Sequence, residues 1–80
     1  MPGYSAALLL HISGEPEGRA SYAEAMKECG LNEGQMERAV RALLDERLIV
    51  RSDDDEDARV KWLTVTTDGQ HVVDDLIKQP

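Results

Sequence analysis

A glycine between two helix-start signatures strongly limits the folds that this chain can adopt. Ser21 and Glu24 have the spacing of a capping box, in which a hydroxyl accepts from the backbone N–H three residues later and the acid reaches back. Asn32 and Gln35 repeat this spacing with amide side chains. Gly30, between the two boxes, favours the left-handed conformation that ends a helix. Two helices joined by so short a turn predict a helix-turn-helix.

The rest of the chain supplies the elements of a winged form of this motif. Tyr4, Leu8 and Ile12 recur at helical spacing, and apolar and polar residues alternate from Arg59 to Val65 as in a strand. We expect a single α+β domain over residues 1–80, a winged helix-turn-helix with a three-helix core, a two-stranded β-hairpin wing and a C-terminal helix. The expected elements are helices at about 4–13, 21–29 and 32–46, strands at about 48–50 and 59–65 and a last helix at about 67–79, which places the helix-turn-helix at about 21–46 and the wing at about 48–65.

Four finer expectations concern the joints between these elements. Residues 19–20 read as a short extended link, and 48–50 as a short buried strand. Thr67 is expected to cap the last helix, with Gln70 at the box position. Trp62 stands mid-strand, and we expect it to pack the hairpin on the first helix rather than to serve as an exposed interaction residue.

The composition excludes several classes of protein. The net charge is −7, and a negative field slows the approach to nucleic acid and favours solubility or a basic partner. The single cysteine, Cys29, excludes an internal disulfide and fits a reducing cytoplasm. No apolar run approaches the roughly 18 residues of a membrane span, and the first residues lack the pattern of a signal peptide. We therefore expect a cytoplasmic protein with no membrane segment.

Catalytic and metal-binding patterns do not appear in the sequence. There is no Gly-x-Ser-x-Gly, no phosphate-cradling glycine loop and no Cys/His dyad, so we expect neither enzyme activity nor a cofactor. Asp53, Asp55 and Asp57 have the spacing of the first ligands of an EF-hand. However, Ala58 stands where that loop needs glycine and Thr64 where it needs glutamate, so no metal is expected.

Two short patterns in the wing identify a family resemblance. The first reads Asp-x-x-Asp-x-Arg and the second Val-Thr-x-x-Gly, and they comprise Asp54, Asp57 and Arg59, then Val65, Thr66 and Gly69. Both patterns and the spacing between them resemble the wing of the MarR family of bacterial transcriptional regulators, in which leucine is usual at the first position of the second pattern. The resemblance covers about residues 21–76. It points to a truncated member with the core domain only, because these regulators are longer.

The resemblance implies a function and a set of contacts. The function is double-stranded DNA binding as a dimer, with the second helix of the motif in the major groove and the wing near the minor groove. In this chain the oligomeric state is open, because most of the family's flanking helices are missing. The residues implied in DNA binding are Asn32, Gln35, Arg38 and Arg41 for bases, Ser21, Tyr22 and Lys27 for phosphates, and Arg59 in the wing; Asp54, Asp57 and Arg59 are also implied in wing structure.

Departures from the family pattern keep alternatives open. Arg47 stands where glycine is usual, and Ala58 replaces the arginine that commonly precedes the wing arginine. Arg38 and Arg41 can equally pair with acids of their own helix. The five acids from 53 to 57 are read first as a solvated wing tip, and otherwise as a contact for a basic protein partner or a weak site for a divalent cation. The competing function is therefore an acidic protein-interaction module or an inhibitor that mimics DNA.

Overall fold

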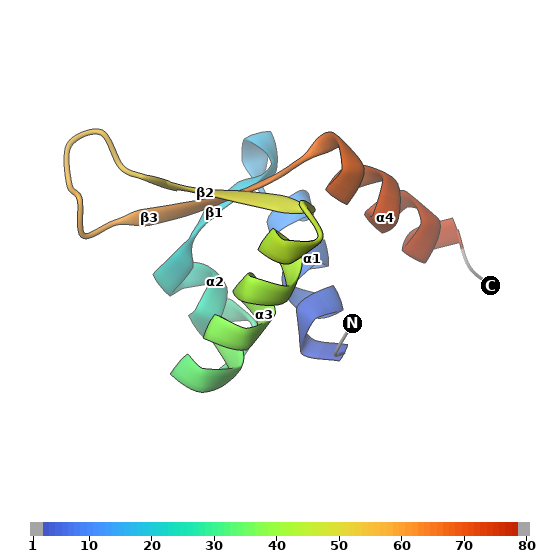
Figure 1. Cartoon of the computed structure of the whole chain (residues 1–80), viewed down its shortest axis with the longest axis horizontal. Coiled ribbons are helices and arrows are strands. Elements are labelled where there is room, and N and C mark those ends of the chain that lie inside the picture. Colours follow the sequence, from blue (N-terminus) through green and yellow to red (C-terminus); the bar gives the residue numbers. More distant parts are fainter. Residues whose placement is uncertain (1–2, 79–80) are drawn as a thin grey trace.

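A computed structural model describes residues 3–78 of the chain and confirms the winged helix-turn-helix. Its helices are α1 (Gly3–Gly14), α2 (Tyr22–Glu28), α3 (Glu33–Asp45) and α4 (Thr67–Lys78), with a 3-10 turn, η1 (Pro16–Gly18). The strands are β1 (Arg19–Ser21), β2 (Ile49–Asp53) and β3 (Lys61–Val65). Figure 1 shows the sheet lying across one end of the first three helices, with the wing projecting on one side and α4 on the other. Gln79, the last residue of the expected C-terminal helix, lies outside the described residues.

The sheet contains one strand more than the sequence predicted. The three strands are antiparallel in the order β1-β3-β2. The extended link at residues 19–20 is part of β1, in which Ala20 lies opposite Leu63 of β3. Leu63 in turn lies opposite Arg51 of β2. The wing is thus a two-stranded hairpin whose base is held by a third strand.

A single apolar core joins the helices to the sheet. The expected stripe of α1 is correct at Leu8 and Ile12, which are fully buried. From β3 it is Leu63 that enters the core, so Trp62 points to the opposite face of the sheet. The expectation that Trp62 packs the hairpin on the first helix is therefore wrong, since Leu63 has that role. The buried apolar residues are Leu8, Leu9, Ile12, Ala20, Ala25, Met36, Ala39, Val40, Leu43, Leu48, Ile49, Leu63 and Val73.

Two other expectations at the joints need correction. Val50 is 52% exposed, because it lies on the outer face of the sheet while its neighbour Ile49 points into the core. The cap of α4 is Thr66 and not Thr67, since the Thr66 hydroxyl accepts the backbone N–H of Gly69 at 2.9 Å. The same hydroxyl donates to the carbonyl of Arg47 at 2.8 Å, which fixes it at the helix start.

Within residues 3–78, no helix is both long and apolar enough to cross a membrane, and no cluster of three or more His, Cys, Asp or Glu side chains is arranged to hold a metal ion. Cys29 is half-buried beside the core, and burial raises the pKa of its thiol, with Glu28 adding to the effect.

Candidate nucleic-acid interface

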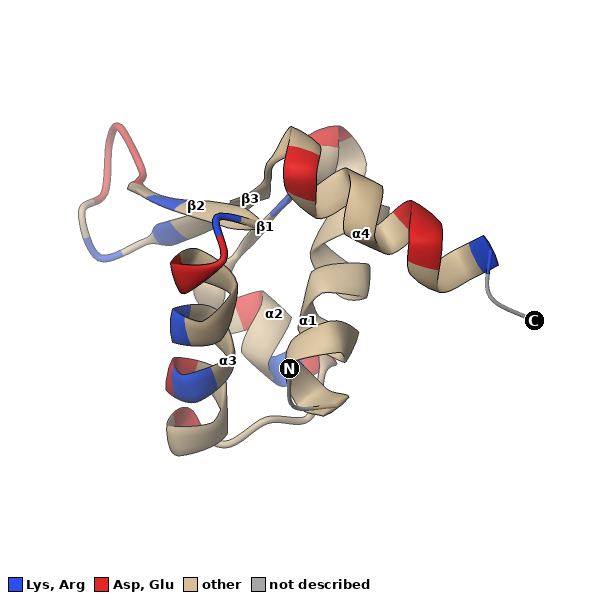
Figure 2. Cartoon of the chain, turned by 45° about the vertical axis from the view of Figure 1, so that its right-hand side comes forward, with Lys and Arg blue, Asp and Glu red and all other residues tan. Residues whose placement is uncertain are grey.

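The outer side of α3 is the surface that a helix-turn-helix presents to DNA. Met36, Ala39, Val40 and Leu43 bury the inner side of this helix. The opposite side is solvent-exposed and carries Gly34, Arg38, Arg41 and Asp45. Figure 2 shows that basic and acidic positions follow one another along α3, on the side turned away from α1 and α2. The outer side of α3 is therefore exposed and its charge is mixed, and its use as a surface that reads DNA stays a prediction.

The start of α3 uses the two amide side chains that were expected to read bases. The oxygen of Asn32 accepts the backbone N–H of Gln35 at 2.8 Å, and the oxygen of Gln35 accepts the backbone N–H of Asn32 at 3.0 Å. This is the predicted capping box in its complete form. Bidentate recognition of adenine needs both the oxygen and the nitrogen of an amide. In this geometry each amide oxygen already accepts one backbone N–H, so a bidentate contact to adenine would have to share or displace the capping bond.

The two arginines of α3 are both exposed, but only one of them is hydrogen-bonded to another helix. The Nε of Arg38 donates to the hydroxyl of Tyr4 at 3.3 Å, so this side chain lies back toward α1. Arg41 is exposed, and within residues 3–78 neither arginine forms an ion pair, so the alternative of pairing with helix acids is not realised. Arg41 is consequently the cation of α3 that is most available to a ligand.

The residues expected to meet phosphates have different surroundings. Ser21 caps α2 by accepting the backbone N–H of Glu24 at 3.2 Å, which confirms one half of the predicted capping box; within residues 3–78 the return bond from the Glu24 side chain is not formed. The Tyr22 hydroxyl donates to Glu37 of α3 at 3.0 Å. Burial raises the pKa of Tyr22, and its hydrogen bond to Glu37 acts in the same direction. Lys27 is exposed in the last turn of α2.

A further cation, Arg51, belongs to this region and was missed as a contact residue. Its guanidinium lies 5.3 Å from the centre of the Tyr22 ring. Arg51 is opposite Leu63 in the sheet, so both side chains leave the sheet on the side that faces the helices. The two-residue period of a strand, counted from the apolar Ile49, was the sequence signal that could have placed it on this side. Arg51, Tyr22 and Glu37 thus connect the wing, α2 and α3.

Next to this connection lies an open groove of about 610 Å³ between α2 and α3. Its floor includes Ala23 and Met26, and two acids, Glu33 and Glu37, lie on the side formed by α3. Phosphates are repelled here, so any DNA contact made by this groove must involve bases or bound cations.

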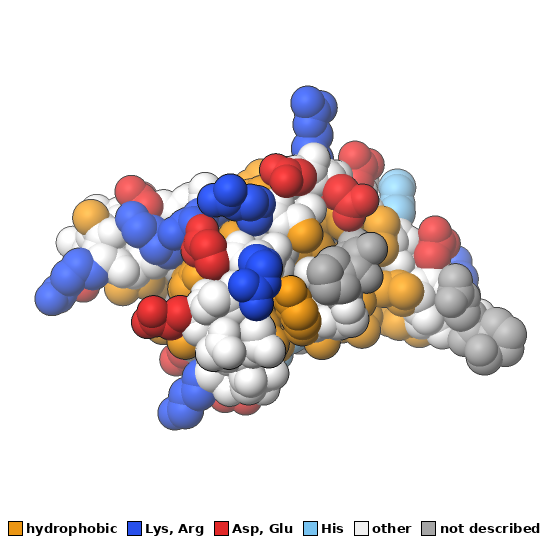
Figure 3. Space-filling model, turned by 60° about the horizontal axis from the view of Figure 1, so that its bottom comes forward, with side chains coloured by type: hydrophobic (Ala, Val, Ile, Leu, Met, Phe, Trp, Pro, Cys, Tyr) orange, Lys and Arg blue, Asp and Glu red, His pale blue; other side chains and the backbone are white. Residues whose placement is uncertain are grey.

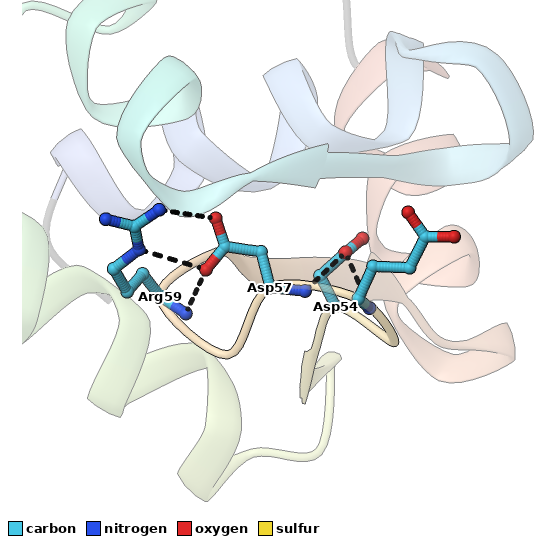
Figure 4. Close-up of polar contacts among 4 residues, drawn as sticks. Asp54, Asp57 and Arg59 are labelled. Carbon is cyan, nitrogen blue, oxygen red and sulfur yellow. Dashed lines mark hydrogen bonds and ion pairs between the residues drawn. The ribbon is translucent and has the colours of Figure 1, made fainter.

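The wing tip is organised by its own acids (Figure 4). One oxygen of Asp54 accepts the backbone N–H groups of Glu56 and Asp57, each at 3.1 Å, and the other accepts Nε1 of Trp62 at 2.9 Å. These bonds hold the pKa of Asp54 below its usual value, and the indole bond has the largest effect. Asp54 therefore bonds the backbone of the tip and the indole of β3, and the role in wing structure that the family pattern implies for it stays a prediction.

Asp57 and Arg59 form the second contact of the tip. The Nε and Nη2 of Arg59 donate to the two oxygens of Asp57, each at 3.1 Å, and the backbone N–H of Arg59 adds a third bond at 3.0 Å. The guanidinium holds the pKa of Asp57 below its usual value. Arg59 thus pairs with Asp57 and not with Asp54. A phosphate in the minor groove would have to compete with this pair.

The remaining tip acids differ in their exposure. Asp53 pairs with Lys61 at 2.6 Å, opposite it in the hairpin, whereas Asp55 and Glu56 are exposed. Three of the five acids are thus used inside the wing. Figure 3 shows a mixture of charges on the lower face of the molecule, where several basic side chains lie near one another and acidic side chains lie beside them.

Solved structures match the fold of this chain closely, although their sequences are only distantly similar to it. No protein-family model matches the chain, and no curated protein matches it. Among solved structures, AbsC, a MarR family transcriptional regulator from Streptomyces coelicolor, aligns with a TM-score of 0.88 at 12% identity, over 96% of this chain and 52% of that one. Sco3205, a MarR family transcriptional regulator from the same organism solved in complex with DNA, aligns with a TM-score of 0.85 at 25% identity, over 91% and 46%. The adhesin competence repressor AdcR from Streptococcus pyogenes aligns with a TM-score of 0.83 at 16% identity, over 94% and 54%.

These likenesses confirm the resemblance to the winged-helix core of MarR-type regulators at the level of the fold. The chain spans about half the length of the solved structures that it matches.

Proposed function

We propose that this chain is a small MarR-like transcriptional regulator that binds double-stranded DNA. In this proposal α3 enters the major groove and the wing lies near the minor groove. The observation that carries it is the winged helix-turn-helix itself, which aligns with the DNA-bound Sco3205 at a TM-score of 0.85 and exposes Arg41 on the outer side of α3. Exposed acids of α3, among them Glu37 and Asp45, repel phosphates, so DNA must approach this helix in a way that keeps phosphates away from them.

The mixed charge predicts a particular kind of binding. Each phosphate neutralised by a protein cation makes log K fall with log salt by about 0.9. Lys27, Arg38 and Arg41 are the exposed cations of α2 and α3, so we expect a shallow slope of roughly −3 for each bound chain. Sequence preference then depends on base contacts, in which arginine reads guanine and an acid such as Glu33 accepts from cytosine.

The proposal is tested by selecting duplexes from a random pool and then titrating the recovered sequence with salt. Arg41→Gln is expected to weaken binding, and Arg38→Ala to broaden the recovered sequences. Lys78→Gln is the matched control, because it also removes one positive charge but lies far from α3, at the end of α4. Its mass in solution is measured beside that of the wild type, because the dimer contact proposed below also lies on α4. If a folded sample binds no duplex at low salt, the proposal is wrong, and the protein-interaction alternative for the acidic wing becomes the hypothesis to pursue.

We further propose that the chain acts as a homodimer through α4. The exposed apolar residues Leu76 (37%) and Ile77 (70%) lie at the end of this helix, away from the sheet. Helix-turn-helix dimers bind two half-sites about one helical turn apart, so a two-fold dimer doubles a weak contact surface. Sedimentation velocity of the wild type and of Ile77→Glu measures this directly: the wild type should be dimeric and the variant monomeric. Equal masses for the two would contradict the use of α4.

A further inference from the structure

The turn that joins α3 to the wing has an arginine where the backbone favours glycine. Arg47 has a φ of 59°, in the left-handed region. Its backbone N–H donates to the carbonyl of Leu44 at 3.0 Å, and the N–H of Leu48 donates to that of Leu43 at 2.9 Å. This pair of bonds is the Schellman motif, whose left-handed residue is usually glycine because it has no Cβ to strain.

The backbone of this turn is also fixed from the opposite side. The Thr66 hydroxyl donates to the carbonyl of Arg47 at 2.8 Å, and the N–H of Thr66 donates to the carbonyl of Leu48 at 3.0 Å. Leu48 itself is buried. With both sides bonded, the turn cannot relax to a conformation that suits a side chain. The direction in which the Arg47 side chain leaves the backbone is therefore set by the fold.

The Arg47 side chain has no partner that would explain its presence. Residue 47 is exposed, and within residues 3–78 its guanidinium forms neither an ion pair nor a hydrogen bond. The two residues before it, Asp45 and Glu46, are exposed acids. A strained residue that gains nothing within its own chain points to a role toward a ligand.

The position of this turn in the fold indicates which kind of ligand Arg47 would bind. Figure 2 shows it in the corner where the upper end of α3 meets the base of the wing. When α3 lies in the major groove and the wing lies near the minor groove, the sugar–phosphate strand that separates the two grooves must cross this corner. Arg51, the other exposed arginine near the start of the wing, is instead turned toward the Tyr22 ring of α2, so Arg47 is the cation that the turn itself presents.

We infer that Arg47 is a DNA-contacting residue that binds a backbone phosphate at the corner between α3 and the wing. This inference rests on the proposed DNA-binding function and adds to it a contact that the family pattern, with glycine at this position, does not supply. The contact positions the duplex and reads no base. It also offsets the repulsion from Asp45 and Glu46 at the end of α3.

The test compares three variants with the wild type on a mixed-sequence duplex of about three helical turns. Arg47→Gly removes the charge and relieves the strain, whereas Arg47→Gln removes the charge and keeps the strain. Arg47→Lys keeps the charge, and Lys78→Gln again controls for the change in net charge. Because glycine suits the turn, Arg47→Gly should remain folded, so a loss of binding in this variant reports on the side chain.

The expected result is that the Gly and Gln variants lose affinity alike and that their salt slopes become shallower by about 0.9 for each bound chain. Between about 50 and about 200 mM salt, the ratio of wild-type to variant affinity should then fall by about 3.5-fold. The Lys variant and Lys78→Gln should keep the wild-type slope. Wild-type slopes in both the Gly and Gln variants, with binding intact, overturn the role of Arg47 alone. A wild type that binds no duplex overturns the proposed function, and this inference with it.

Discussion

Replacing Gly69 with alanine should destabilise the protein, although alanine is the better helix former. Gly69 lies in the first turn of α4, and a Cβ built there would be 2.1 Å from the carbonyl oxygen of Leu48 and 2.8 Å from Cγ2 of Val65. An ordinary contact needs about 3.4 Å, so α4 and the turn before β2 must separate by about 1 Å. That movement strains or breaks the bond from the N–H of Thr66 to Leu48.

The size of the effect follows from these contributions. Overpacking against a fixed backbone costs about 1–3 kcal/mol, and a lost hydrogen bond adds about 1 kcal/mol. The higher helix propensity of alanine offsets about 1 kcal/mol of this loss in the free energy of unfolding. The net loss is about 2 kcal/mol, which for a domain of this size lowers Tm by roughly 8–16 °C. Thermal unfolding followed by circular dichroism, with urea unfolding beside it, measures both quantities.

Gly34→Ala is the matched control, because it makes the same change in another helix. A Cβ at Gly34 meets nothing closer than 3.5 Å. This variant should therefore be as stable as the wild type or more stable, by up to about 1 kcal/mol. If Gly69→Ala is as stable as the wild type while Gly34→Ala behaves as expected, the clash with Leu48 does not govern the choice of residue, and the reasoning fails.

Three other substitutions test separate contacts. Arg47→Gly should raise the free energy of unfolding in urea by about 1 kcal/mol, because it removes left-handed strain; an unchanged midpoint would show that the turn is not strained. Asp54 has a pKa lowered below 3.8, so its ionised form stabilises the wing above that pH, and this stabilisation is lost as the pH falls through the lowered value. The emission of Trp62, the single tryptophan, should change during that acid titration, and Asp54→Asn should give the acid-side emission already at neutral pH; identical titrations of the two proteins would argue against the indole bond. Ser21→Ala should lower stability by about 1 kcal/mol through loss of the α2 cap, and a wild-type thermal transition would show that the cap contributes nothing.

The parts of the fold that could be predicted are those set by neighbours in the sequence. The caps at Ser21 and Asn32 involve a side chain and a backbone N–H three residues apart, so residue type and spacing were sufficient. The strand at residues 19–21 could not be recognised in this way. It is three residues long and is a strand only because Ala20 pairs with Leu63, which is remote in the sequence. The choice between Thr66 and Thr67 as the cap likewise depended on a remote carbonyl.

The same distinction applies to the candidate interface. The sequence identified α3 and the wing, but not which of their charged groups are free to meet a ligand. Arg38 is bonded to Tyr4, which is remote in the sequence, whereas Gln35 and Arg59 are engaged by neighbours only two or three residues away. The roles of these residues toward DNA stay predictions, as does a protein partner for the acidic wing.

The hydroxyl of Thr66 connects the turn before the wing to the start of the last helix. Thr66 holds the carbonyl of Arg47 with its proton and the N–H of Gly69 with its lone pair, so a single atom bonds both the exit of α3 and the entry of α4. There is consequently no free hinge at this junction. A force that tilts α4 must either break the bonds of Thr66 or rotate the end of α3 with it. A displacement of α4 is therefore transmitted through Thr66 to the end of α3, the helix proposed to enter the major groove.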